Sequence, residues 1–125
     1  MTEIFVFGSN LAGRHGAGAA LYARLHHGAQ PGVGSGPTGT SYAIPTKDEY
    51  MNILPASTIA LYVGFFISYA RAHPDLTFIV TAIGCGLARP KQMSYKERYQ
   101  QIGKMFKDAP QNCILPPEWN PGLPI

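Results

Sequence analysis

The segment Ile4-Phe5-Val6-Phe7-Gly8-Ser9-Asn10 decides the fold of this chain. Four consecutive apolar residues stop at Gly8, and this pattern predicts a buried strand that enters a turn. Glycines then punctuate residues 10–18. Ala17 to His26 is rich in alanine and leucine, and Gly28 is placed to stop a helix. The order strand, glycine loop, helix is therefore predicted for the first part of the chain.

The middle of the chain repeats this alternation. Ser41 to Thr46 predicts a second strand, with Pro45 near its end, and residues 55–73 carry apolar side chains at helical spacing. Residues 76–83 form an apolar run continuous enough to predict a strand that is buried on both faces. Residues 30–40 consist almost entirely of Gly, Pro, Ser and Thr, so we expect an irregular loop there.

The last third begins with a second glycine loop, Gly84-Cys85-Gly86, directly after the predicted strand. Ser94 and Glu97 have the spacing of a capping box, which predicts the start of a helix, and residues 112–115 predict a short last strand. Strands that alternate with helices imply an α/β fold, here a three-layer α/β/α sandwich around a small sheet that is largely parallel or mixed. Ligands bind such sheets beyond the carboxyl ends of the strands.

Length and composition are those of one folded domain. The chain has 125 residues, of which 46% are hydrophobic and only 14% are charged, and this balance excludes an intrinsically disordered chain. The 14 glycines and 11 prolines fall in clusters without a period, which indicates elaborate loops. We expect a domain over residues 1–115 and a proline-rich tail over residues 116–125.

Several features bear on location and on bound metals. Residues 1–3 run straight into the first strand without the basic region and cleavage site of a secretory signal, which favours an intracellular, cytoplasmic protein. The longest uncharged run, residues 53–70, contains Pro55 and predicts no membrane-spanning helix, so a membrane is not an expected partner. Cys85 and Cys113 do not make a disulfide framework, and no Cys/His spacing matches a zinc site. Neither a metal nor a cofactor is expected.

Basic residues gather in one stretch. The formal net charge is only +3, but six of the ten basic residues lie between positions 89 and 107 with one acidic residue among them. Such a stretch either attracts an anion (nucleic acid, phosphate or an acidic partner) or forms the solvated face of a helix. The six residues are Arg89, Lys91, Lys96, Arg98, Lys104 and Lys107.

The two glycine loops carry the main functional signal. Glycines let the backbone approach a ligand closely, and successive N–H groups at the start of a helix form an anion-binding concavity. Gly13-x-x-Gly16-x-Gly18 matches neither the dinucleotide fingerprint nor the P-loop, and its spacing suits an ordinary tight turn as well as a phosphate site. A second such loop at residues 84–86 favours the phosphate interpretation.

The chain resembles the macrodomain family in four segments, which stand in the order and at the strand ends found in that family. Within it, the resemblance is to the branch that holds the terminal ADP-ribose glycohydrolase and the antitoxins of DNA ADP-ribosylating toxins, and to a small macrodomain-like family of phages and prophages. It spans roughly residues 4–115. The segments are Phe7-Gly-Ser-Asn10, Arg14-His-Gly-Ala-Gly-Ala-Ala20, Ile44-Pro-Thr-Lys47 and Ala82-Ile-Gly-Cys-Gly-Leu87.

This resemblance implies a macrodomain-like sandwich with a pocket for ADP-ribose or a related NAD-derived nucleotide. By analogy, the first loop surrounds the distal ribose and the second wraps the diphosphate with backbone N–H groups. The expected ligand-binding residues are Gly8, Ser9, Asn10, Gly13, Arg14, His15, Gly16, Ala17, Gly18, Thr46, Gly84, Cys85, Gly86 and Leu87.

Two candidate catalytic residues follow. Lys47 matches the lysine that, in the glycohydrolase branch, attacks the anomeric carbon of the distal ribose, as an amine with a lowered pKa is able to do. His15 is a candidate acid, base or ribose contact, or else a hydrogen-bonding loop residue. The aspartate that follows the second loop in that branch is replaced here by Ala88, and neither Asp48 nor Glu49 is placed by a motif to substitute for it.

Three hypotheses about function remain open. The first is a hydrolase that removes ADP-ribose from a protein or nucleic acid through Lys47. The second is a reader or sequestering protein for an ADP-ribose-type signal, which needs the loops but not the lysine. The third is a basic accessory protein that binds nucleic acid through residues 89–107.

Overall fold

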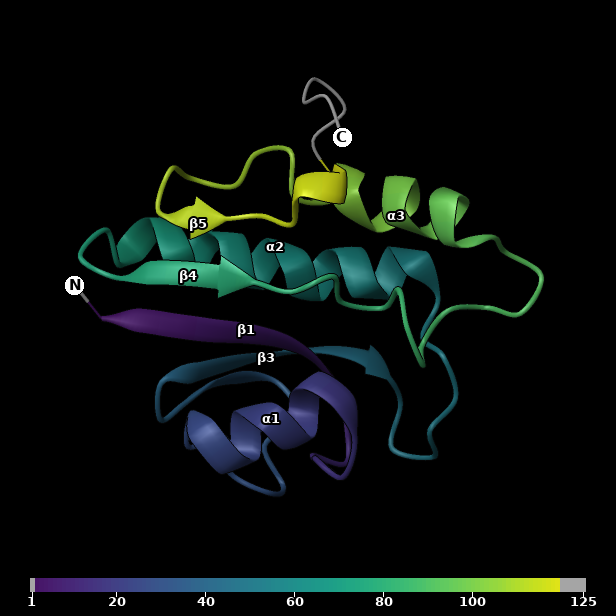
Figure 1. Cartoon of the computed structure of the whole chain (residues 1–125), viewed down its shortest axis with the longest axis horizontal. Coiled ribbons are helices and arrows are strands. Elements are labelled where there is room, and N and C mark those ends of the chain that lie inside the picture. Colours follow the sequence, from purple (N-terminus) through teal and green to yellow (C-terminus); the bar gives the residue numbers. More distant parts are fainter. Residues whose placement is uncertain (1, 120–125) are drawn as a thin grey trace.

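The computed structural model describes residues 2–119 of the chain, and its secondary structure alternates between strands and helices (Figure 1). The alternation predicted from the sequence is therefore confirmed as an α/β fold. The elements are β1 (Glu3–Asn10), α1 (Gly18–His26), β2 (Gly36–Thr38), β3 (Ser41–Lys47), α2 (Ala56–Ala72), β4 (Thr77–Val80), α3 (Tyr95–Lys104), β5 (Cys113–Ile114) and a 3₁₀ helix (Pro117–Trp119).

The strands form one mixed sheet in the order β2-β3-β1-β4-β5. β1 pairs in parallel with β3 on one side and with β4 on the other, and β5 pairs in parallel with β4. Figure 1 shows β1 between β3 and β4, whose arrowheads point the same way. The carboxyl ends of these three strands therefore meet at one edge of the sheet.

The alternating side chains of β1 pack into two different cores. Ile4 and Val6 are buried in the larger core with residues of α2 and α3, whereas Phe7 belongs to a smaller core with Ala20 and Ala23 of α1. Successive side chains of a strand point to opposite faces, so one strand supplies both cores. Helix α1 thus covers one face of the sheet, and α2 and α3 cover the other.

Two expectations about strands were wrong in part. Residues 36–38 lie in the segment predicted as an irregular loop, but they form β2, which pairs antiparallel with β3 at the edge of the sheet. The partner strand supplies these hydrogen bonds, so local propensity did not reveal them. The run predicted over residues 76–83 is a strand only at Thr77–Val80, and its burial alternates: Phe78 and Val80 are buried, but Ile79 is half-buried.

The helix boundaries follow the predicted signals. Ser94 and Glu97 make the reciprocal hydrogen bonds of a capping box at the start of α3, and Gly28 takes a positive φ just after α1. Trp119, from the segment predicted as a tail, is buried against Phe106 with their ring centroids 4.9 Å apart. The rest of that tail, residues 120–125, lies outside the described residues.

The first glycine loop is held by a close backbone approach. Gly13 has φ of +69°, and a Cβ added there would lie 2.3 Å from the carbonyl carbon of Gly32. The N–H of Gly32 donates to the carbonyl of Gly13, at an N···O distance of 2.9 Å. Gly13 therefore ties the loop to residues 30–34.

We predict that Gly13→Ala lowers the free energy of unfolding by about 2–4 kcal/mol, because it combines an unfavourable φ with a steric clash. The matched control is Gly16→Ala in the same loop, where an added Cβ meets nothing within 4 Å. Urea unfolding of both variants provides the measurement. Equal stabilities would contradict the packing described here.

Candidate functional site

A cleft of about 600 Å³ opens at the carboxyl ends of β1, β3 and β4. Both glycine loops contribute to its walls, together with the end of β3 and the turn that follows it. Its lining residues are Gly8, Ser9, Asn10, Arg14, Gly16, Ala17, Gly18, Ala19, Ala20, Thr46, Lys47, Met51, Thr81, Ala82, Ile83, Gly84, Gly86, Leu87 and Ala88.

The two glycine loops are neighbours in space. A Cβ added at Gly8 would lie 3.5 Å from the backbone nitrogen of Gly84, so the end of β1 packs against the start of the second loop. The parallel pairing of β1 with β4 brings about this proximity, because both loops leave adjacent strands in the same direction. Residues of both loops line one cleft.

Backbone N–H groups in both loops are free to bind a ligand. Among the described residues, the N–H groups of Gly16, Ala17 and Gly18 in the first loop have no hydrogen-bond partner. The same holds in the second loop for Gly86 and Leu87, although the N–H of Cys85 is bonded to the carbonyl of Ala82. Unpaired N–H groups of this kind bind the oxygens of an anion.

The amino-terminal end of α1 also faces the cleft. Its N-cap, Ala17, makes no side-chain capping bond, and the first turn contains no acidic residue. The partial positive charge at this end of the helix is therefore not neutralised within the described residues. A phosphate is an appropriate ligand for such a helix end.

Three polar side chains of the cleft brace the loops. The Asn10 amide donates to the carbonyl of Arg14 (2.8 Å) and accepts from the N–H of Arg14 (3.0 Å). Ser9 donates to the carbonyl of Gly34, and Thr46 donates to the carbonyl of Ser9. These residues fix the shape of the cleft and leave the backbone N–H groups as its principal donors.

Arg14 and Lys47 are the cationic side chains at the cleft. Neither makes an ion pair within residues 2–119, and Lys47 stands at the last position of β3, beside Asn10 of β1. No carboxylate is among the described lining residues. Asp48 turns away and accepts N–H groups of Asn52 and Tyr50, which hold its pKa below the ordinary value. It therefore organises the turn after β3.

Three residues expected to bind the ligand do not line this cleft. His15 is buried, its Nε2 lies 3.2 Å from the carbonyl oxygens of Gln30 and Val33, and its ring packs edge-on against Phe7. Gly13 packs against residues 30–34, as described above. Cys85 is buried, and burial raises its pKa to about 11, so its thiol is protonated at neutral pH.

Other lining residues were not anticipated from the sequence. Met51 lies in the turn after β3 with φ of +69°, a conformation that non-glycine residues rarely adopt and that often marks a functional position. Thr81 and Ala82 join β4 to the second loop. The only sequence signal for them was their place directly after a strand. The N–H and the hydroxyl of Thr81 both donate to the carbonyl of Val6 in β1, a contact that depends on strand pairing.

The buried side chain of Arg98 supports the second glycine loop. It was counted with the basic stretch as an anion-attracting or solvated residue, but only 1% of its surface is exposed. Its Nε donates to the carbonyl of Gly84 (2.7 Å) and its Nη2 to that of Ala88 (2.9 Å). The guanidinium thus holds the loop at its first residue and at its end.

Comparison of the chain with models of protein families, with curated proteins and with solved structures finds no match. No helix within residues 2–119 has the length and apolarity needed to cross a membrane. Within the same residues, no group of three or more His, Cys, Asp or Glu side chains is arranged to hold a metal ion.

The two thiols lead to a prediction about pH. Burial raises the pKa of both Cys85 and Cys113 to about 11, from about 9 in an unfolded chain. A raised pKa in the folded state gives stability that is complete below pH 9 and is lost as the pH rises toward 11. We expect the free energy of unfolding to fall over this range by up to about 1.4 kcal/mol per pH unit for each thiol.

Urea unfolding between pH 8 and 11 measures this effect. The double variant Cys85→Ala/Cys113→Ala is the control, because it removes both thiols and leaves every other ionisable group in place. Parallel pH profiles for the two proteins would contradict the assignment.

Proposed function

We propose that this protein binds ADP-ribose or a related NAD-derived nucleotide in the cleft between its two glycine loops, as a macrodomain-like protein. The observation that carries the proposal is that residues with unpaired backbone N–H groups line one cleft from both loops. The motifs that resemble macrodomains stand at these loops, and the cleft volume of about 600 Å³ suits a ligand of nucleotide size.

The charges at the cleft favour a diphosphate. A diphosphate diester carries two negative charges, and its oxygens need several donors once they leave water. Unpaired N–H groups, the end of α1 and the side chains of Arg14 and Lys47 meet this need, and no described carboxylate opposes it. A ligand with a single phosphate would use only part of this set.

The remainder of the ligand has apolar surface available. Leu87 is 76% exposed at the rim of the cleft, and Met51 lies on the wall formed by the turn after β3. A nucleobase is able to pack on such side chains, which would hold the base by apolar contact.

Hydrolysis of an ADP-ribosyl linkage is the second candidate function, favoured by the position of Lys47 in the cleft. Attack by an amine on the anomeric carbon also requires an acid for the leaving group. Ala88 stands where the resembling branch has its aspartate, and His15, Asp48 and Glu49 do not line the cleft. We therefore rank binding, by a reader or sequestering protein, above hydrolysis.

The binding proposal is tested by calorimetric titration with ADP-ribose, with AMP as the single-phosphate control. We expect measurable affinity for ADP-ribose and at least about tenfold weaker binding of AMP, since each tenfold step corresponds to about 1.4 kcal/mol of lost contacts. Absence of heat beyond dilution for ADP-ribose would overturn the proposal.

Variants of Ala17 distinguish an effect of added charge on ligand binding from an effect on protein stability. Ala17→Asp and Ala17→Asn each add an N-cap to α1 and are expected to stabilise the protein by about 1 kcal/mol. Both side chains occupy N–H groups of the cleft, but only the aspartate repels a phosphate. We expect the affinity for ADP-ribose to fall from the native protein to Ala17→Asn and further to Ala17→Asp, while thermal stability does not fall.

Lys47→Ala distinguishes the two candidate functions. For a hydrolase, release of ADP-ribose from modified protein or DNA is expected to be abolished in this variant. Its binding of ADP-ribose is expected to weaken but to stay measurable, because Arg14 and the free backbone N–H groups remain. For a reader, neither the native protein nor the variant releases ADP-ribose. Release that persists in the variant would exclude Lys47 as the nucleophile.

A further inference from the structure

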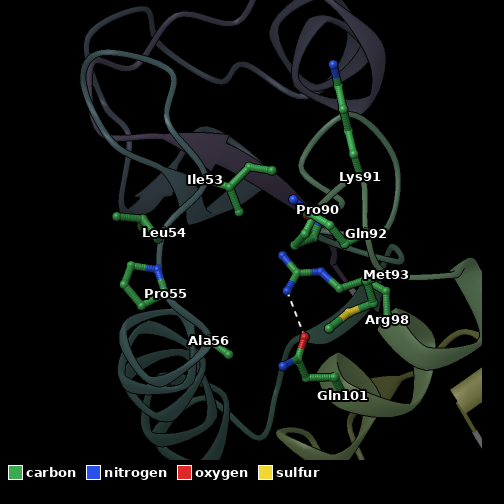
Figure 2. Close-up of a pocket in the computed structure, with 10 residues that line it drawn as sticks. All are labelled: Ile53, Leu54, Pro55, Ala56, Pro90, Lys91, Gln92, Met93, Arg98 and Gln101. Carbon is green, nitrogen blue, oxygen red and sulfur yellow. Dashed lines mark hydrogen bonds between the residues drawn. The ribbon is translucent and has the colours of Figure 1, made fainter.

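A second cavity, of about 430 Å³, lies between the start of α2 and the segment that leads into α3 (Figure 2). It is distinct from the cleft described above, because the two have no lining residue in common. Most of its lining side chains are apolar. The lining residues are Ile53, Leu54, Pro55, Ala56, Pro90, Lys91, Gln92, Met93, Arg98 and Gln101.

The charge of Arg98 is not neutralised by an acidic residue. Figure 2 shows its guanidinium extending from α3 toward residues 53–56 across the cavity, with a hydrogen bond from Nη1 to Gln101 Oε1 (2.8 Å). Its other two bonds go to uncharged carbonyl oxygens of the second loop. One N–H on each terminal nitrogen of Arg98 has no hydrogen-bond partner among the described residues. No acidic side chain among these residues forms an ion pair with Arg98. A buried cation of this kind creates a positive potential in the adjoining cavity.

The start of α2 adds to this potential from the opposite wall. Its N-cap is Pro55, which makes no side-chain capping bond, and the first turn contains no acidic residue. Within the described part of the chain, the N–H groups of Ala56 and Ser57 have no hydrogen-bond partner. The positive end of a 17-residue helix and a buried guanidinium therefore border the same apolar cavity.

We propose that this cavity binds the carboxylate of a small organic acid with an apolar body. A carboxylate carries one charge on two oxygens, which the Gln101 amide and the free N–H groups at the start of α2 are able to bind. The guanidinium of Arg98, only 1% exposed, attracts this charge without direct contact. The apolar side chains of Ile53, Leu54 and Met93 then contact the hydrocarbon part. A phosphate dianion fits less well, because much of its surface would face these apolar side chains.

The test is a titration of the ¹⁵N-labelled protein with hexanoate, with the isosteric neutral hexanamide and with inorganic phosphate, followed by NMR at the Gln101 amide. We expect saturable shifts with hexanoate and at least about tenfold weaker binding of the other two. Absence of saturable shifts with hexanoate would overturn the proposal. Equal or tighter binding of hexanamide or phosphate would also overturn it.

Two variants with the same effect on the helix distinguish a loss of binding from a loss of folding. Ala56→Glu and Ser57→Glu both place an acid in the first turn of α2, where it stabilises the helix, but only Ala56 lines the cavity. We expect Ala56→Glu to weaken hexanoate binding by at least about tenfold and Ser57→Glu to change it by less than about threefold. Equal effects of the two substitutions would contradict a site in this cavity.

Discussion

Strand β1 is the constraint on which the rest of the structure depends. Both of its edges are paired, with β3 and with β4, and its side chains alternate between the two cores of the protein. A strand held on both edges and both faces has one position and one register. Near the carboxyl end of this strand, Gly8 packs against Gly84, so the two glycine loops meet where β1 and β4 pair. The cleft is therefore a direct consequence of the packing of one strand.

The chemistry of the cleft resides mainly in its backbone. The side chains of Ser9, Asn10 and Thr46 donate to backbone carbonyls of the protein itself. Apart from Arg14 and Lys47, the free donors of the cleft are backbone N–H groups. Such donors are fixed by the fold and need no reorganisation when an anion arrives. A site of this kind suits tight recognition of a diphosphate. It supplies few groups that transfer protons, which is why we rank binding above hydrolysis.

Arg98 connects the two cavities of the molecule. It holds the second loop through the carbonyls of Gly84 and Ala88, and it faces the cavity beside α2. A buried guanidinium without an acidic partner costs free energy, and its three hydrogen bonds to oxygen atoms reduce that cost. The basic residues of the stretch 89–107 therefore have different roles. Arg89 lies over the ring of Tyr95 at 3.9 Å, and Arg98 is structural.

The sequence by itself determined the α/β fold, the capped start of α3 and the position of both glycine loops, because these depend on local periodicity, capping residues and glycine. It also indicated Lys47 and the loop residues as neighbours, through a motif order that resembles macrodomains. Only the tertiary structure decided that β2 forms, that His15 and Cys85 are buried, and that Arg98 lies beneath the second loop. Each of these outcomes depends on contacts between residues far apart in the chain. Local patterns do not encode the direction in which a side chain points once the strands have paired.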